Sequence, residues 1–497
     1  MEFGWKQFIL LSFLNAVILI EAINLKIATD RAVQIVSDKY LSIAIDTGII
    51  RHNWENLNFG SPKVESLARA LSPCYLRVGG SEADFMKFSP DTHNVRFYNQ
   101  SGLYMSDYYD NKFVNFTMFS NQWDELNHFV TKVGWSLIFD LNSLLRENGQ
   151  WLPDNAKLLM DYTSQKGYKI TGWELGNEPN SYKHHVGYSI SGSQRAKDYS
   201  KLHSLLNQYP QWRKSVIIGP STTQLSKTSA EKYFTEFLQT GGPDIVTNPT
   251  FHHYYINGRE ATIDQFMDID ILNSLMPEIN KGNEIAKHPP FGKTWLGETG
   301  SAYGGGAPGL SDTYVAGFMW LDKLGISAVG GLDVLIRQTF YGGHYSIIDD
   351  KTSDPLPDYW LSYIYKTLVG RSVLNVSVDD PEGLVRMYSH CTNVKRSNYT
   401  AGSITVYGMN LGNSFKTINF PQYGDDVTLH VYVLQPQESL KSQAVTLNGR
   451  HLKLNEDFTL PNVLIPVIRT GNVTFPPQSF GFIVLPNSKA EACQTVK

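Results

Sequence analysis

Two short strings in this chain each place a glutamate at the end of an apolar, strand-like run. Trp-Glu-Leu-Gly-Asn-Glu-Pro-Asn at 173–180 carries Glu178, and Thr-Trp-Leu-Gly-Glu-Thr at 294–299 carries Glu298. Glycoside hydrolysis needs such a pair, because one carboxyl group protonates the leaving oxygen while the other attacks the anomeric carbon or activates a water. The strands of a (β/α)8 barrel bring side chains from their C-terminal ends to one face. We therefore predict Glu178 and Glu298 as a catalytic pair.

Residues beside the two glutamates have side chains suited to binding a sugar. Asn177 directly precedes Glu178, and its amide can hydrogen-bond a sugar hydroxyl. Tyr254 closes another candidate strand, and its hydroxyl can donate to the nucleophile and keep it ionised. A packed aromatic cluster explains Tyr254 equally well. The glycine-rich segment 302–308 follows Glu298 and permits a close approach of backbone to a ligand.

Other chemistries find little support in the sequence. His252 and His253 are adjacent, but no further ligands at metal-binding spacing accompany them, so we expect no metal and no organic cofactor. No Gly-x-Ser-x-Gly elbow indicates a serine hydrolase. The formal net charge is −4, without a global basic excess, so nucleic acid is not an expected partner.

The elements that must position these residues alternate along the chain. Candidate strands lie at 40–46, 74–78, 136–140, 172–175, 215–218, 250–254, 293–296 and 331–336. Candidate helices lie at 122–132, 155–166, 197–208, 230–240, 263–285, 312–324 and 358–369. This alternation predicts parallel βαβ units, hence an α/β fold in which residues 40–372 form a (β/α)8 TIM barrel.

The flanking segments have a different character. Residues 373–497 are rich in Val, Thr, Tyr and Leu and are punctuated by turns, which predicts a C-terminal antiparallel β-sandwich. The strand-like stretch 23–39 precedes the first barrel strand, and we expect it to join the sandwich. Residues 91–111 are polar and rich in Tyr, Asn and Asp, and they are interpreted as a long surface loop of the barrel.

The N-terminus predicts a secretory route. An apolar run at 7–20 follows Lys6, which is typical of a signal peptide covering residues 1–22 and cleaved near Ala22. A signal anchor is the alternative, but the run is short for a membrane span and no second run follows, so we expect no integral span after cleavage. We expect a secreted protein of the extracellular matrix, or a lysosomal one. Asn-x-Ser/Thr sequons fit this route and lie at Asn99, Asn115, Asn375, Asn398 and Asn472.

The chain has three cysteines: Cys74, Cys391 and Cys493. An oxidising compartment favours one pair and one residue left over. Cys391 and Cys493 lie in the same C-terminal segment, whereas Cys74 lies in an apolar run that is interpreted as a buried strand. A buried thiol that packs as a small hydrophobe is the simplest interpretation of Cys74.

Long strings of the chain closely resemble the heparanase family of glycoside hydrolases. They are found at 71–80, 173–180, 251–259, 295–308, 317–325 and 354–360. The resemblance runs from about residue 24 to the C-terminus. It implies a barrel carrying a β-sandwich and a retaining endo-β-glucuronidase that cleaves heparan sulfate or a related glycosaminoglycan.

The same resemblance assigns residues. It implies that Glu178 is the acid/base, that Glu298 is the nucleophile, and that Cys391 and Cys493 form a disulfide. Further positions match those that line the family's cleft: Asp46, Asn177, Tyr254, Arg259, Gly305, Gly306, Gln338 and Tyr359.

Two departures from the family shape our expectations. The family's long excised linker corresponds here to the shorter stretch 91–111, so we expect an uncut chain to be active. The family's two basic clusters are reduced here to Lys112 and Lys227, although sulfate groups call for Lys or Arg partners. We predict that Lys112 binds substrate. Two other functions are kept: an exo-β-glucuronidase acting on less sulfated glycans, and a non-catalytic glycosaminoglycan-binding paralogue.

Overall fold

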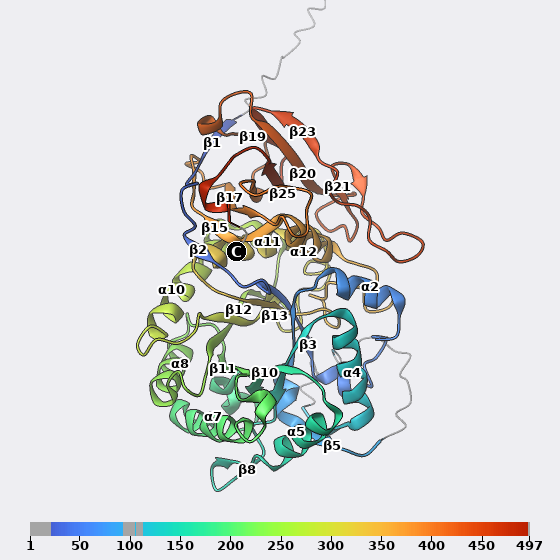
Figure 1. Cartoon of the computed structure of the whole chain (residues 1–497), viewed down its shortest axis with the longest axis vertical. Coiled ribbons are helices and arrows are strands. Elements are labelled where there is room, and N and C mark those ends of the chain that lie inside the picture. The colour runs from blue at the N-terminus through green and yellow to red at the C-terminus, as the bar shows by residue number, and fades with distance from the viewer. Residues whose placement is uncertain (1–20, 93–104, 106–112, 496–497) are drawn as a thin grey trace, which may run out of the picture.

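The computed structural model describes residues 21–92, 105 and 113–495. A barrel and a β-sandwich are stacked along the long axis of the molecule (Figure 1). Almost all of the expected signal peptide, most of the loop at 91–111, and both Lys112 and Asn99 lie outside the described residues. None of the helices in the described ranges combines the length and apolarity needed to cross a membrane.

Eight parallel strands close into the barrel in the order β10-β11-β12-β13-β14-β3-β4-β7. They are β3 (Leu41–Asp46), β4 (Tyr75–Gly79), β7 (Ser136–Leu141), β10 (Ile170–Leu175), β11 (Val216–Thr222), β12 (Asn248–Asn257), β13 (Trp295–Tyr303) and β14 (Leu335–Arg337). Each lies at a candidate strand of the sequence, which confirms the predicted fold class. The strands are readable because both faces of a parallel barrel are buried, which gives nearly continuous apolar runs such as that of β3.

Helices cover the outside of the barrel (Figure 1). The longer ones are α2 (Pro62–Ala70), α4 (Ser120–Val133), α5 (Asp154–Lys166), α7 (Gly192–Leu206), α8 (Thr228–Gly241), α10 (Leu275–Ile285), α11 (Ala316–Val329) and α12 (Pro357–Leu368). The single helix expected at 263–285 is wrong. The segment forms η4 (Ile263–Met267), α9 (Ile269–Asn273) and α10, because the side chain of Asp268 accepts from the Ile271 amide and begins a new helix there.

The sandwich consists of two sheets. The smaller has the order β16-β1-β19-β24, and the larger has the order β2-β15-β17-β18-β25-β20-β21-β22, with β23 also paired to β20. Their bounds are β1 (Glu21–Ile27), β2 (Gln34–Ile35), β15 (Val369–Leu374), β16 (Val376–Val378), β17 (Val385–Thr392), β18 (Ile404–Asn410), β19 (Lys416–Asn419), β20 (Thr428–Pro436), β21 (Val445–Leu447), β22 (Arg450–His451), β23 (Val467–Thr470), β24 (Asn472–Phe475) and β25 (Ser479–Leu485).

The N-terminal stretch contributes a strand to each sheet of the sandwich. β2 pairs with β15 in the larger sheet, and β1 pairs with β16 and β19 in the smaller one. The β1–β19 pairing is parallel, so this sandwich is not purely antiparallel as the sequence predicted. β1 precedes the barrel and β19 follows it, so no hairpin joins the two strands and their directions need not alternate.

Helices α11 and α12 lie between the barrel and the sandwich (Figure 1). The guanidinium of Arg386 donates to both carboxylate oxygens of Asp322, at 2.6 and 3.1 Å, and the Tyr388 hydroxyl donates to the same group at 2.6 Å. The rings of Tyr314 and Phe480 stack at 4.5 Å between centroids. These contacts fix the sandwich against the barrel.

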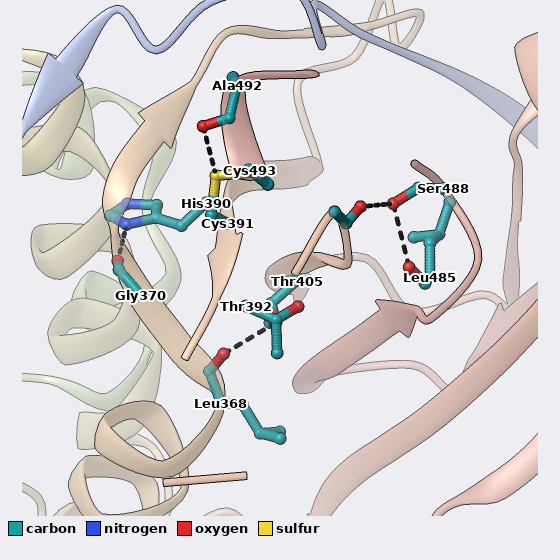
Figure 2. The surroundings of a disulfide bond; sticks show 11 residues. Leu368, Gly370, His390, Cys391, Thr392, Thr405, Leu485, Ser488, Ala492 and Cys493 are labelled. Atoms are coloured by element: carbon teal, nitrogen blue, oxygen red, sulfur yellow. Dashed lines mark hydrogen bonds between the residues drawn. A yellow bond between two sulfur atoms is a disulfide. The ribbon is translucent and has the colours of Figure 1, made fainter. Parts of the chain in front are cut away.

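A disulfide joins Cys391 in β17 to Cys493, as the resemblance implied (Figure 2). The residues it links are 102 positions apart, and closing such a loop stabilises the fold by about 4–5 kcal/mol in the chain-entropy model. Cys74 is free and buried. The sequon asparagines in the described ranges are exposed: Asn115, Asn375, Asn398 and Asn472.

Candidate active site

Glu178 and Glu298 line one cleft of about 270 Å³. Glu178 follows the C-terminal end of β10, and Glu298 lies within β13, which are the fourth and seventh barrel strands along the chain. The cleft thus opens where the C-terminal ends of the strands meet, as expected for a barrel enzyme. Its other lining residues are Asp46, Gly80, Ser81, Asn177, Ser181, His185, Thr223, Gln224, Lys227, His252, Tyr254, Tyr303, Gly304 and Tyr345.

Glu298 is held as a carboxylate by two donors. The Tyr254 hydroxyl donates to Oε1 at 2.7 Å, and Arg77 Nη1 donates to Oε2 at 2.8 Å. Burial alone raises the pKa of the Glu298 carboxyl, but the charges of His252 and Arg77 and these two hydrogen bonds hold the pKa below its ordinary value. An ionised carboxylate in a cleft has the state a nucleophile requires.

Arg77 is the centre of the charge network and was not predicted from the sequence. Its guanidinium is fully buried, donates from Nε to Glu174 at 2.6 Å and from Nη2 to the Asn177 side-chain oxygen at 2.9 Å, and lies 3.9 Å from Asp140. Burial lowers the pKa of Arg77, but the carboxylates of Glu174 and Glu298 outweigh that effect and raise the pKa above its ordinary value. Arg77 therefore stays cationic. Arg77 hydrogen-bonds both to Glu298, the expected nucleophile, and to Asn177, which precedes the expected acid Glu178.

Glu178 occupies an unusual backbone conformation. Its φ and ψ are 44° and 52°, in the left-handed region, and its amide donates to the carbonyl of Ser221 at 2.9 Å. Ser221, at the end of the neighbouring β11, also has a positive φ of 55°. Non-glycine residues adopt this region at an energetic cost and concentrate at functional sites. The Glu178 side chain lies beside His252, whose Nδ1 is 3.1 Å from Oε1.

Asn177 is fixed from several sides. Its backbone N–H donates to Asp84 at 3.1 Å, and its side-chain nitrogen donates to the Ser81 hydroxyl at 3.3 Å. The Tyr182 hydroxyl donates to the same Asp84 carboxylate at 2.7 Å, which stiffens the turn around Glu178. A side chain locked in this way can present its amide to a sugar without losing further rotamer freedom.

Of the other expected cleft residues, Asp46 lines the cleft, whereas Gly305, Gly306 and Gln338 are absent from its described lining. Asp46 accepts from Gln338 Nε2 at 3.2 Å. The Gly305 carbonyl accepts from the His344 amide at 2.7 Å, and Gly306 has a φ of 90°. A Cβ at Gly306 would approach the Tyr345 backbone nitrogen to 2.6 Å, so glycine is needed for Tyr345 to reach the cleft.

Tyr359 does not line the cleft, which corrects the expectation from the resemblance. It lies in the first turn of α12 with no exposed surface, and its hydroxyl donates to the Leu67 carbonyl at 2.9 Å. Tyr359 is on the face of α12 that packs inward, so its ring is buried in the core instead of reaching the cleft. Arg259 is exposed beyond β12 and is absent from the described lining of the cleft, and Lys112 lies outside the described residues.

Sequence comparison places the chain among known enzymes. The family model described as "Glycosyl hydrolase family 79, N-terminal domain" matches residues 50–325 of this chain. The chain belongs to glycosyl hydrolase family 79. This family 79 chain is 39% identical to heparanase from Mus musculus over 511 residues, which covers 95% of each protein. The resemblance inferred from the sequence is confirmed, and the protein is a glycoside hydrolase.

Two further relatives widen the comparison. The protein named inactive heparanase-2 from Homo sapiens is 34% identical, with 95% of this chain and 90% of the relative covered. The hyaluronoglucuronidase of Hirudo nipponia is 32% identical, with 92% and 96% covered. Among solved structures, a 4-O-α-L-rhamnosyl-β-D-glucuronidase from Fusarium oxysporum 12S aligns with a TM-score of 0.66 at 14% identity, covering 93% of this chain and all of that one. That likeness supports the fold.

Proposed function

We propose that this protein is a retaining endo-β-glucuronidase of heparan sulfate-type glycosaminoglycans, with Glu178 as acid/base and Glu298 as nucleophile. One observation carries the proposal: the two cleft carboxyl groups have different surroundings. Glu298 receives hydrogen bonds from Arg77 and Tyr254, whereas Glu178 has the imidazole of His252 at 3.1 Å. Divergent environments for two carboxyl groups assign one as acid and the other as nucleophile.

In the first step, Glu298 attacks the anomeric carbon of the glucuronic acid residue and a glycosyl-enzyme ester forms. Glu178 gives its proton to the leaving glycosidic oxygen as the bond to the anomeric carbon breaks. Tyr254 and Arg77 keep Glu298 ionised until the attack, and their hydrogen bonds to it weaken as its negative charge is lost in forming the ester.

In the second step, Glu178 removes a proton from a water molecule, and the water attacks the anomeric carbon to release Glu298. The strained backbone at Glu178, tied to the Ser221 carbonyl, keeps the same side chain in place for both steps. Asn177, held by Arg77 and Asp84, is suited to hydrogen-bond a hydroxyl of the reacting sugar.

The relatives named heparanase and hyaluronoglucuronidase support a β-glucuronide as substrate. A relative named inactive heparanase-2 keeps the non-catalytic alternative in view. The presence of both glutamates, each with ordered partners, favours catalysis over binding alone. The exo-acting alternative differs only in the position of the cleaved bond: the cleft would accept the end of the glycan rather than its interior.

The test is digestion of heparan sulfate by the full chain, followed by size separation of the products. Early appearance of mid-sized oligosaccharides supports endo cleavage, and release of single glucuronic acid residues indicates exo cleavage. NMR of the first-formed product should show the β anomer. Glu298→Gln should abolish turnover, while Glu260→Gln, at an exposed position after β12, should retain it. Wild-type protein without activity on heparan sulfate, hyaluronan or aryl glucuronides would contradict the proposal.

A further inference from the structure

A second cavity, of about 250 Å³, lies between the barrel and the sandwich. Tyr40 and Pro73 line it, and they precede barrel strands β3 and β4. The cavity is therefore at the N-terminal ends of these strands, at the opposite end of the barrel from Glu178 and Glu298. The disulfide Cys391–Cys493 forms part of its sandwich wall, and the neighbouring His390 contacts the Gly370 carbonyl through Nδ1 at 2.7 Å (Figure 2).

The lining of this junction cavity is strongly basic. It contains Lys366 from α12, Arg371 from β15, and Lys395 and Arg396 from the loop between β17 and β18. Among the described residues that line it, Asp38 is the sole acidic one. The Asp38 carboxylate is exposed and lies 4.0 Å from the ammonium of Lys39.

Three of these cations, Lys366, Arg371 and Arg396, donate to neutral backbone carbonyls. Lys366 Nζ donates to Pro73 at 2.6 Å, Arg371 Nε donates to Val36 at 2.8 Å, and Arg396 Nη1 donates to Ser72 at 2.6 Å. Carbonyl oxygens satisfy hydrogen bonds but do not neutralise charge. Outside the lining, the half-buried carboxylate of Asp333 interacts electrostatically with Arg371. The lining therefore carries more positive than negative charge, and among the described residues the buried cation Lys366 has no carboxylate bonded to it.

Lys366 is the most deeply buried of these four cations. The residue is 7% exposed, and burial lowers the pKa of its ammonium to about 8, with the neighbouring Arg396 adding to the decrease. An anion placed in the cavity would relieve the repulsion between these groups and return Lys366 to a fully charged state.

We propose that the junction cavity binds a tetrahedral oxyanion, either a sulfate ester on a glycan or a free inorganic sulfate or phosphate. Guanidinium groups from the sandwich and an ammonium from the barrel supply donors that match such a group. A ligand held by both parts would clamp them together. The site is independent of the hydrolytic cleft, and binding there does not depend on the proposed function.

The test uses the full chain and measures its melting temperature with increasing sodium sulfate, with sodium chloride at the same ionic strength as reference. We expect a saturable stabilisation by sulfate beyond chloride. Arg371→Gln and Lys395→Gln, at exposed positions, should each weaken the apparent sulfate affinity about tenfold. Lys453→Gln, an exposed lysine elsewhere in the sandwich, is the matched control and should bind as wild type does.

A second arm separates the two ligand sources. A sulfated glucosamine disaccharide that binds more tightly than inorganic sulfate identifies a glycan ester as the ligand, and the unsulfated disaccharide should not bind. Equal affinities identify a free oxyanion. The proposal is overturned if sulfate stabilises no more than chloride does, or if Arg371→Gln and Lys395→Gln bind like Lys453→Gln. Hydrolysis of an aryl glucuronide should be the same in these three variants, which separates this site from the cleft.

Discussion

Tyr254→Phe tests the electrostatic role assigned to the tyrosine beside the nucleophile. The substitution removes one hydroxyl and with it the 2.7 Å hydrogen bond to Glu298 Oε1. Burial raises the pKa of Tyr254 well above its ordinary value, and the Glu298 charge adds to this increase, so the hydroxyl remains a donor at any working pH. Its loss should raise the pKa of Glu298, which the intact site holds below its ordinary value.

The size of the change follows from the type of bond. A hydrogen bond to a charged acceptor contributes about 1.5–3 kcal/mol, and one pKa unit corresponds to about 1.36 kcal/mol, so the pKa of Glu298 should rise by about 1–2 units. A nucleophile is lost as pH falls through its pKa. The acidic limb of kcat/KM should therefore move to higher pH by the same amount, and below the new limb the rate falls about tenfold per pH unit.

The assay is kcat/KM on an aryl β-glucuronide between pH 3 and pH 8. Tyr255→Phe is the matched control, because Tyr255 is the next residue on β12 and its hydroxyl lies near Asp322 rather than Glu298. That variant should keep the wild-type limb. If folded Tyr254→Phe protein has the same acidic limb as Tyr255→Phe, the hydrogen bond does not set the ionisation of the nucleophile, and the reasoning fails.

Three further outcomes are expected. Glu178→Ala should lose most turnover of substrates with poor leaving groups, and on an aryl glucuronide with a good leaving group azide should restore turnover by giving the β-glucuronosyl azide; an α product would contradict double displacement. Lys227→Gln should raise KM for acidic substrates about threefold with kcat unchanged, because Lys227 is an exposed cation in the cleft, and Lys232→Gln, in helix α8 that follows it, should not. Thiol titration of denatured protein should find one group, Cys74, before reduction and three after it. In the native protein Cys74 should be inert, since burial raises its pKa to about 11.

The barrel was predictable because each of its strands is buried on both faces and stands out as an apolar run. The same signal located Glu178, which comes shortly after the end of β10, and Glu298, which follows the apolar start of β13. Helix limits were less readable. The pattern across 263–285 is helical throughout, but the segment is divided at Asp268, whose side-chain oxygen caps α9, and again at Ser274. Tyr359 shows the limit of matching by resemblance: a tyrosine at the start of a helix packs on whichever face the helix buries, which the string alone does not reveal.

Arg77 shows why the electrostatics of the site could not be predicted from the sequence. In Leu-Arg-Val at 76–78 the arginine interrupts an apolar strand, and by itself it suggests only a tolerated charge. Its partners Glu174 and Glu298 are 97 and 221 residues away, on strands that meet it only when the barrel closes. Each carboxylate makes the buried cation tolerable, and the cation in turn helps to hold the pKa of Glu298 below its ordinary value. The reactivity of Glu298 is therefore a consequence of barrel closure, so a substitution that disturbs strand register far from the cleft should reach the chemistry through Arg77.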